Sequence, residues 1–250
     1  MGVSYTEGVF RDRNPIKRWL QQQRLDSAIG FAQKARDSVT RVIDFGAGSG
    51  ELCKHLVHAY PHATIVCYEP CSDLLEEAKI ELKGLPRIEF HASFDSIPAG
   101  QADLLFCLEV FEHIPLSMRT ASLAEVGALL KDDGEAVFGV PVEVGLPALY
   151  KGMFRMSRRY GAFDARPKHV LMATLGMPPK ERPVGILPPD VQVHNEHMGF
   201  DHRQFRKELA GQFALAKASA SPFPVLGTAL CPEAYFVVRK RVRKPDGAAR

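Results

Sequence analysis

Hydrophobic residues follow two different periods along the first half of the chain. Short apolar runs at 42–45, 64–68 and 102–108 have the length of buried parallel strands. Between them the apolar residues recur three or four positions apart, as in the stretch 51–60, which is typical of helices that pack on a sheet. Strands that alternate with helices predict an α/β fold with a doubly wound, mostly parallel sheet.

The same patterns predict the elements at both ends of the chain. A helix is expected from Asn14 to about Arg36, and another from Ser117 to about Leu130. A third should begin after Asp201, which has the form of an N-cap, and end at Gly211. Strands at 213–219 and 234–238 then close the chain, with no helix expected between them.

A glycine-rich turn follows the first strand and is the strongest indication of a ligand. Asp44 ends the strand, and glycines stand at positions 46, 48 and 50 before the next helix. Such glycines let a ligand lie against bare backbone near a helix N-terminus. A carboxylate at Asp44 suits a ligand that carries positive charge and suits a dianionic pyrophosphate poorly. Glu69 ends the second strand, where an acid can accept hydrogen bonds from both ribose hydroxyls.

The second informative block is the apolar strand at 102–108 with the residues that follow it. It ends with Leu108, Glu109, Glu112 and His113 at the sheet edge where open α/β folds bind ligands. Together with the glycine turn, this block resembles the class I S-adenosylmethionine (SAM)-dependent methyltransferases, and in particular their ubiquinone-biosynthesis-like small-molecule branch. The resemblance implies SAM as cofactor and a seven-stranded sheet with an antiparallel last strand.

The resemblance also implies which residues contact the cofactor. The family places an adenine-contacting acid after the third strand, where this chain has Ser93-Phe94-Asp95 in place of the commoner Gly-Asp. The remaining contacts would hold the ribose and methionine parts. The expected cofactor-binding residues are Asp44, Gly46, Ala47, Gly48, Gly50, Glu69, Pro70, Ser93, Phe94, Asp95, Leu108 and Glu109.

Two histidines are candidates for catalysis. Histidine as a residue type suits proton removal near neutrality, which makes His113, after the fourth strand, a candidate base. His197 precedes the helix that in relatives lies close to the acceptor and is the second candidate. Some quinone O-methyltransferases of the branch bind a divalent metal, but Glu109, Glu112 and His113 leave an oxygen shell incomplete. We therefore expect no metal.

Composition limits the function further. The chain has 250 residues and a net charge of +3, and the segment 239–250 alone carries +5 of it, which leaves −2 on the rest. Without a basic face on the catalytic half, no nucleic-acid partner is expected. The five cysteines form no Cys-x-x-Cys pair, so neither a disulfide framework nor a cysteine zinc site is indicated. No signal-type or membrane-spanning apolar run is present, so a cytoplasmic protein is expected.

A long insertion interrupts the regular pattern at 142–195 and is expected to be a lid over the acceptor. Its first part predicts an amphipathic helix with Lys151, Arg155, Arg158 and Arg159 on one side. Three alternatives remain open: a lid whose basic stripe is solvated, a site for an anionic acceptor, or a contact of residues 147–160 with a membrane or lipid-linked substrate.

The sequence therefore predicts a small-molecule methyltransferase in five segments. They are an N-terminal cap helix region (1–36), a SAM-binding core (37–141), the insertion (142–195), the rest of the core (196–241) and a disordered basic tail (242–250). The acceptor is expected to be polar or anionic and linked to a sugar, phosphate or lipid, with O-methylation favoured. A quinone or phenol O-methyltransferase with a divalent metal and a non-catalytic SAM-binding regulator are the alternatives. The pattern does not specify an oligomeric state.

Overall fold

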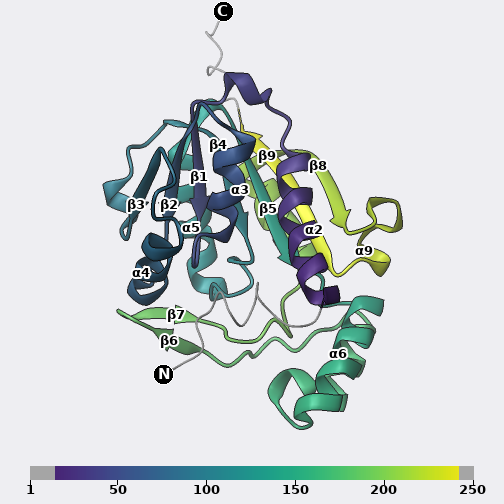
Figure 1. Ribbon diagram of the computed structural model, residues 1–250. Coiled ribbons are helices and arrows are strands. Elements are labelled where there is room, and N and C mark those ends of the chain that lie inside the picture. The colour runs from purple at the N-terminus through teal and green to yellow at the C-terminus, as the bar shows by residue number, and fades with distance from the viewer. Residues whose placement is uncertain (1–14, 242–250) are drawn as a thin grey trace, which may run out of the picture.

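A single seven-stranded sheet runs through the protein (Figure 1), whose computed structural model describes residues 15–241. The strand order is β3-β2-β1-β4-β5-β9-β8. Parallel pairing joins the first five strands of that order, and β9 runs antiparallel to both β5 and β8. The fold class and the antiparallel last strand are thus confirmed. The strands are β1 Arg41–Phe45, β2 Thr64–Tyr68, β3 Ile88–His91, β4 Ala102–Leu108, β5 Leu130–Pro141, β8 Phe213–Ser221 and β9 Glu233–Lys240.

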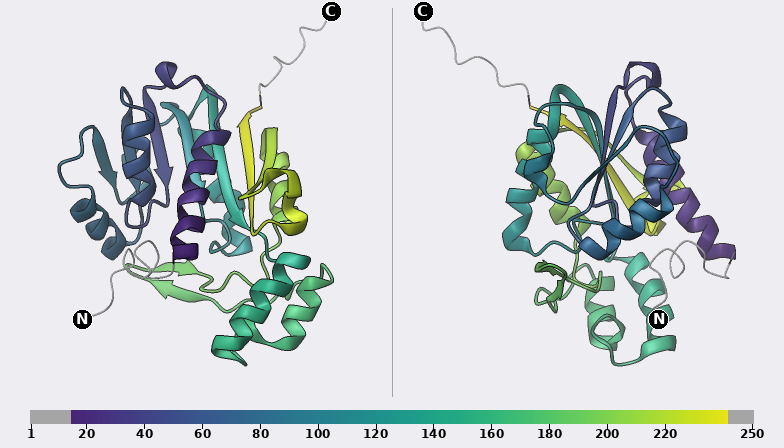
Figure 2. Two further views of the ribbon diagram at one scale, coloured as in Figure 1. Left: turned by 45° about the vertical axis from the view of Figure 1, so that its right-hand side comes forward. Right: turned by 60° about the vertical axis from the view of Figure 1, so that its left-hand side comes forward.

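Helices cover both faces of the sheet (Figure 2). Buried residues of α2, α3 and α4 pack on one face, and buried residues of α5 and α8 pack on the other. Each strand therefore needs apolar side chains on both sides, which explains the continuous apolar runs. The helices are α2 Pro15–Phe31, α3 Glu51–Ala59, α4 Ser72–Glu81, α5 Leu116–Leu129 and α8 His202–Gln212.

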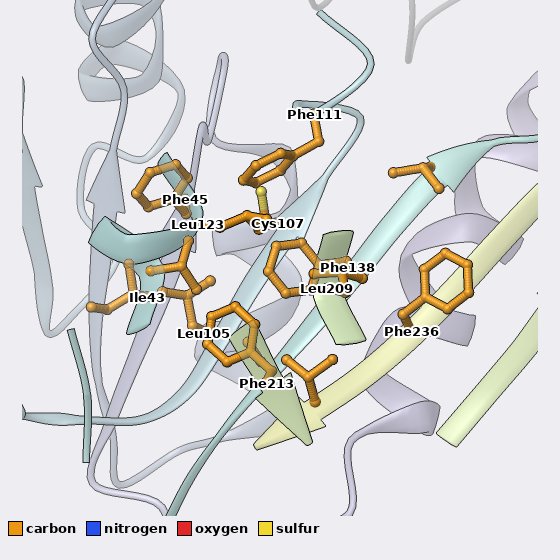
Figure 3. Packing of buried hydrophobic residues seen from close by; sticks show 14 of the residues in the cluster. Ile43, Phe45, Leu105, Cys107, Phe111, Leu123, Phe138, Leu209, Phe213 and Phe236 are labelled. Atoms are coloured by element: carbon orange, nitrogen blue, oxygen red, sulfur yellow. The ribbon is translucent and has the colours of Figure 1, made fainter. Parts of the chain in front are cut away.

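Aromatic side chains dominate the core on the α5 and α8 face (Figure 3). Phe138 of β5 lies 5.4 Å from Phe111 and 5.8 Å from Phe205 between ring centroids, both in edge-to-face geometry. Cys107 of β4 is buried in the same cluster. This packing fixes the end of β4, from which the segment carrying Glu109, Glu112 and His113 emerges.

Two helix ends and one additional helix are the main differences from the expected elements. Helix α2 ends at Phe31, before Arg36, and the Gln33 amide just beyond it donates to the buried Glu135 carboxylate (2.6 Å). Gly211 lies within α8, which ends at Gln212 because the buried Phe213 begins β8 directly. Between β8 and β9 the chain forms a short helix, α9 Gly227–Leu230, where none was predicted. The predicted disordered tail at 242–250 lies outside the described residues, as do residues 1–14.

The insertion lies beyond the C-terminal edge of the parallel strands (Figures 1 and 2). It contains α6 Leu146–Arg159, α7 Pro167–Thr174 and a hairpin of β6 Gly185–Leu187 and β7 Val191–Val193. The two helices pack closely, since a Cβ on Gly152 would meet a Val170 methyl at 2.5 Å. No helix within residues 15–241 has the length and apolar character needed to cross a membrane.

Buried carboxylates pair with three of the four cations of α6. Arg155 makes a bidentate pair with Glu143 (2.6 and 2.8 Å), and Lys151 adds a third contact at 3.2 Å. Arg159 pairs with the buried Asp164, but 56% of its own side chain stays exposed. The interpretation of a solvated stripe is therefore wrong for Lys151 and Arg155 and holds for Arg158 and Arg159. Apolar side chains of α6 are exposed as well, among them Leu149, Tyr150, Met153 and Phe154.

Candidate active site

The glycine turn between β1 and α3 adopts a conformation that requires glycine. Gly46 and Gly50 have φ angles of +76° and +81°. A Cβ would meet Val110 at 2.5 Å in the first case and Leu82 at 2.6 Å in the second. The amides of Gly46 and Ala47 donate to the Tyr68 carbonyl at 2.9 Å, which ties the turn to the end of β2. The turn thus presents bare backbone at the sheet edge, as the sequence predicts.

Glu69 is fixed against this turn. One carboxylate oxygen accepts from the Gly48 amide at 2.8 Å and the other from the Cys71 amide at 2.9 Å. Burial raises the pKa of Glu69, and the two amides oppose that shift. A carboxylate oxygen can accept more than one hydrogen bond, so lone pairs remain for a ligand hydroxyl.

Asp44, the second acid at the turn, lines a different cavity from Glu69 and is almost fully buried. The side chain is 3% exposed and accepts from the Cys53 thiol at 3.3 Å. Burial raises the pKa of Asp44 to about 7, and the nearby Glu69 charge adds to that rise. A cationic group in the adjoining cavity would favour the charged carboxylate.

Two adjoining cavities open at this edge of the sheet. The smaller, of about 300 Å³, is lined by Asp44, Ala47, Leu108 and three residues of α2. The larger, of about 590 Å³, is lined by Glu69, Pro70 and Tyr68 with residues of α5 and the β6–β7 hairpin. Together they suit an elongated ligand that crosses the glycine turn. The wall that they share consists of Gly46, Gly48, Glu109, His113 and His197.

Most of the expected cofactor residues gather on these walls, and four do not. Gly50 lies behind the turn, and Ser93, Phe94 and Asp95 sit in a 3₁₀ turn that lines neither cavity. A role for those three in adenine binding stays a prediction. Leu74, Val110, Ile114 and Met118 line the larger cavity instead, and no sequence motif pointed to them.

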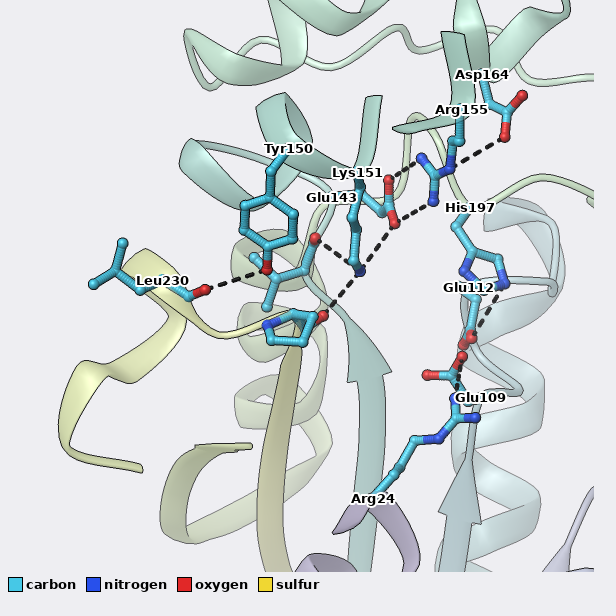
Figure 4. A network of polar contacts seen from close by, with 12 residues as sticks. Arg24, Glu109, Glu112, Glu143, Tyr150, Lys151, Arg155, Asp164, His197 and Leu230 are labelled. Carbon is cyan, nitrogen blue, oxygen red and sulfur yellow. Dashed lines mark hydrogen bonds and ion pairs between the residues drawn. The ribbon is translucent and has the colours of Figure 1, made fainter. Parts of the chain in front are cut away.

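Glu109 is held by a cation from a distant helix. Its carboxylate lies 2.7 Å from the Arg24 guanidinium of α2 (Figure 4). Burial would raise the pKa of Glu109, but Arg24 and then His197 outweigh burial and lower it to about 2. Its φ of +55° is unusual for a residue with a side chain and marks a constrained position.

The sequence predicted a cap helix region at 1–36 but not the residues by which α2 contributes to the site. Gln21, Arg24 and Leu25 line the smaller cavity, while Leu25 and Ala28 are buried against the sheet. The spacing of Gln21, Arg24, Leu25 and Ala28 puts all four on one helical face. Gln21 and Arg24 are polar residues on a helical face that otherwise packs on the core, and this pattern could have indicated that they face a ligand. The helix therefore covers the site and also packs on the sheet.

The two candidate histidines meet on the shared wall. Their Nε2 atoms are 3.3 Å apart, and the rings are edge-to-face with centroids 4.9 Å apart. The Nδ1 of His113 donates to the His194 carbonyl at 2.6 Å, which leaves the Nε2 lone pair free to face His197. Burial lowers the pKa of His197 to about 4, so its imidazole is neutral near pH 7. The neutral imidazole of His197 can therefore accept a proton from a group in the cavity.

The part of the insertion that covers the site is the hairpin. Residues from Leu187 to Asn195 line the larger cavity, whereas α6 lines neither cavity. A lid role for α6 over the acceptor therefore stays a prediction.

Comparison with known proteins agrees with this architecture. Residues 16–170 match the family described as a methyltransferase domain. Magnesium protoporphyrin IX methyltransferase from Synechocystis, solved with S-adenosylhomocysteine (SAH) bound, superposes with a TM-score of 0.59 at 17% identity, covering 94% of this chain and 92% of that one. At that identity the likeness shows the fold alone.

Two curated relatives match parts of the chain. A malonyl-[acyl-carrier protein] O-methyltransferase of Geobacter sulfurreducens is 29% identical over 127 residues, which is 48% of this chain and 47% of the relative. A trans-aconitate 2-methyltransferase of Rhodopseudomonas palustris is 31% identical over 85 residues, 34% of this chain and 33% of the relative. The chain thus spans half or less of the curated relatives that it matches.

Proposed function

This chain belongs to the methyltransferase domain family as a SAM-dependent methyltransferase, and from that premise we propose that it methylates an oxygen of a small polar or anionic molecule. The observation that carries the proposal is the histidine pair, which lies on the wall shared by the two cavities. A neutral imidazole there can take the proton of a hydroxyl acceptor.

The lining residues of the two cavities support one placement of the cofactor. The adenosine part would occupy the larger cavity, with its ribose hydroxyls on Glu69. The methionine part would cross the glycine turn toward Asp44 and Leu108 in the smaller cavity. In this placement the sulfonium methyl faces the shared wall beside Glu109, His113 and His197.

The proposed reaction is an in-line displacement. The acceptor oxygen forms a bond to the methyl carbon as the carbon–sulfur bond breaks, and SAH leaves as the neutral thioether. The hydroxyl proton passes to the Nε2 of an imidazole in the pair. Alignment of the two reactants supplies much of the rate, because the surrounding walls hold both in one geometry.

The acceptor class is proposed from the relatives and the site together. The curated relatives are named for a malonyl-[acyl-carrier protein] and for trans-aconitate, both of which carry carboxylates. An acceptor of the ubiquinone-like branch, a quinone-derived phenol, is the second class to test.

A contact of residues 147–160 with a membrane or a lipid-linked acceptor is a further part of the proposal. Met153 and Phe154 of α6 are 58% and 55% exposed, which supports an apolar contact. Co-sedimentation with anionic vesicles, compared between the wild type and a Met153→Ser, Phe154→Ser variant, tests it. Equal sedimentation of the two would contradict it.

Methyl transfer from methyl-labelled SAM to panels of hydroxylated, phosphorylated, carboxylated and phenolic compounds tests the main proposal. With a hydroxyl acceptor, His113→Gln and His197→Gln should lower kcat by roughly 100-fold with little change in SAH affinity. His58→Gln, an exposed residue of α3, is the control and should keep full activity. Unchanged kcat in both cavity variants would contradict a role for the pair.

A further inference from the structure

Three potential metal ligands converge beside the shared wall of the two cavities. Glu112 and His113 follow β4, and His197 reaches them from the segment before α8. Figure 4 shows Glu112 beside His197. The Oε1 of Glu112 lies 3.9 Å from the Nε2 of each imidazole, and the two Nε2 atoms are 3.3 Å apart. A point equidistant from these three atoms is roughly 2.2 Å from each, the length of a zinc–imidazole or zinc–carboxylate bond.

Glu112 lacks the partners that a buried carboxylate needs. Its side chain is fully buried, and neither oxygen has a hydrogen bond within residues 15–241. Its backbone carbonyl accepts from Arg182 at 2.7 Å, so the main chain at this position is anchored. An unpaired buried carboxylate is costly, whereas a cation between Glu112 and the imidazoles would supply the missing interaction.

His113 is oriented for the same point. Because the Nδ1–H of His113 donates to the His194 carbonyl, its Nε2 carries a lone pair directed toward Glu112 and His197. This arrangement, a ligating nitrogen set by a hydrogen bond from the other ring nitrogen, is typical of metal-bound histidine. Both imidazoles also line the cavities, so an ion there would have an open position on the ligand side.

We propose that Glu112, His113 and His197 bind one divalent transition-metal ion with an open coordination position in the acceptor cavity. Two imidazoles and one carboxylate suit zinc, cobalt or iron, and suit magnesium or calcium poorly. Glu109 is not part of this set, because Arg24 already neutralises it at 2.7 Å. The site therefore differs from the Glu109, Glu112 and His113 combination that the sequence alone suggested.

This inference rests on the proposed function and gives the proton step a different route. A hydroxyl acceptor at the open position would release its proton to water more readily, because the ion stabilises the oxyanion. His113 and His197 would then hold the ion, and proton transfer to an imidazole would apply only to the metal-free protein. The test must therefore measure metal binding independently of methyl transfer.

Calorimetric titration of untagged, chelator-treated protein with Zn²⁺ and with Mg²⁺ provides that measurement. We expect one equivalent of Zn²⁺ to bind and Mg²⁺ to bind far more weakly. Glu112→Gln, His113→Gln and His197→Gln should each weaken Zn²⁺ binding by roughly 100-fold or more. Glu109→Gln and His58→Gln are the controls and should bind Zn²⁺ as the wild type does. Co²⁺ should give the visible absorption bands of a four- or five-coordinate ion, and His197→Gln should remove them.

Titration with SAH on the same samples separates the two proposals. Intact SAH binding with no Zn²⁺ binding would overturn the metal site and leave the cofactor site standing. Zn²⁺ binding that survives all three ligand substitutions would mean an adventitious ion only, and would also overturn the proposal. Circular dichroism of each variant shows whether a loss of binding reflects unfolding.

Discussion

The cofactor side and the acceptor side of the site are built in different ways. On the cofactor side, Asp44, Gly46 and Glu69 stand directly at the ends of β1 and β2, within short motifs of the chain. On the acceptor side, Arg24 meets Glu109 and His113 meets His197 across 85 and 84 residues of sequence. A parallel sheet brings strand ends together by construction, whereas the acceptor side depends on where three separate segments dock.

The two sides also use charge differently. Carboxylates on the cofactor side face a cavity and are satisfied in part by backbone amides, which leaves capacity for a ligand. In the insertion, Glu143 and Asp164 are buried and pair with Lys151, Arg155 and Arg159. Lys151 and Arg155 thus stabilise the fold of the insertion, whereas Arg158 and Arg159 are exposed.

The largest expected effect is on the cofactor side. In Gly48→Val, the side chain would occupy ligand space beside Glu69, and SAH affinity should fall by about 100-fold or more. Gly84→Val is the matched control, because Gly84 also has a positive φ of +86° but adjoins open space. Calorimetry compares the two. Retained SAH binding in a folded Gly48→Val protein would place the cofactor elsewhere.

The insertion should respond in stability and not in cofactor binding. Arg155→Met removes the bidentate partner of buried Glu143 and should lower the free energy of unfolding by about 3 kcal/mol. SAH affinity should stay within twofold of the wild type. Arg158→Met, on the exposed side of α6, should cost less than about 0.5 kcal/mol. A large loss of SAH binding in the Arg155 variant would show that the two sides are not independent.

At the other end of the strands, away from the site, Asp103 of β4 makes the stability of the fold depend on pH. The Asp103 carboxylate accepts hydrogen bonds from the amides of Thr40 and Arg41 and pairs with Lys131 at 2.7 Å. Burial alone would raise the pKa of Asp103, but these contacts outweigh burial and lower it to about 2. A lowered pKa contributes stability above the unfolded value and loses it as pH falls through the folded value. Asp103→Asn should therefore cost about 2 kcal/mol at pH 7, and the difference should narrow between about pH 4 and 2. Denaturant unfolding at several pH values checks this, and a constant difference would contradict it.

The smallest expected effect concerns Asp44. Because its pKa is about 7 in the free protein, SAM affinity should fall as pH drops from 8 to 6, by about tenfold. The raised pKa also means that the charged form opposes folding at pH 7 and above, so Asp44→Asn should raise Tm while weakening SAM binding. Thermal melts measure the change in Tm, and calorimetry measures the change in SAM affinity. If Asp44→Asn raised both or lowered both, the raised pKa and cofactor role of Asp44 would be contradicted.

The sequence predicted the parts of this protein that local pattern determines. The sheet, the glycine turn, Glu69 and His113 follow from periodicity and from residues at strand ends, whereas His197 was expected only from the family resemblance. The ion pairs of α6 could not be predicted, because the sequence does not show that Glu143 and Asp164 are buried beside Arg155 and Arg159. The same holds for Arg24, whose partner lies on another element.

The central claim is that the histidine pair lies where the cofactor presents its methyl group. Titration with SAH, followed through the assigned imidazole resonances by NMR, tests it most directly. Signals of His113 and His197 should shift with SAH, while those of His58 on α3 and His169 on α7 should not. Saturable SAH binding that leaves both cavity imidazoles unperturbed would contradict the placement of the acceptor site.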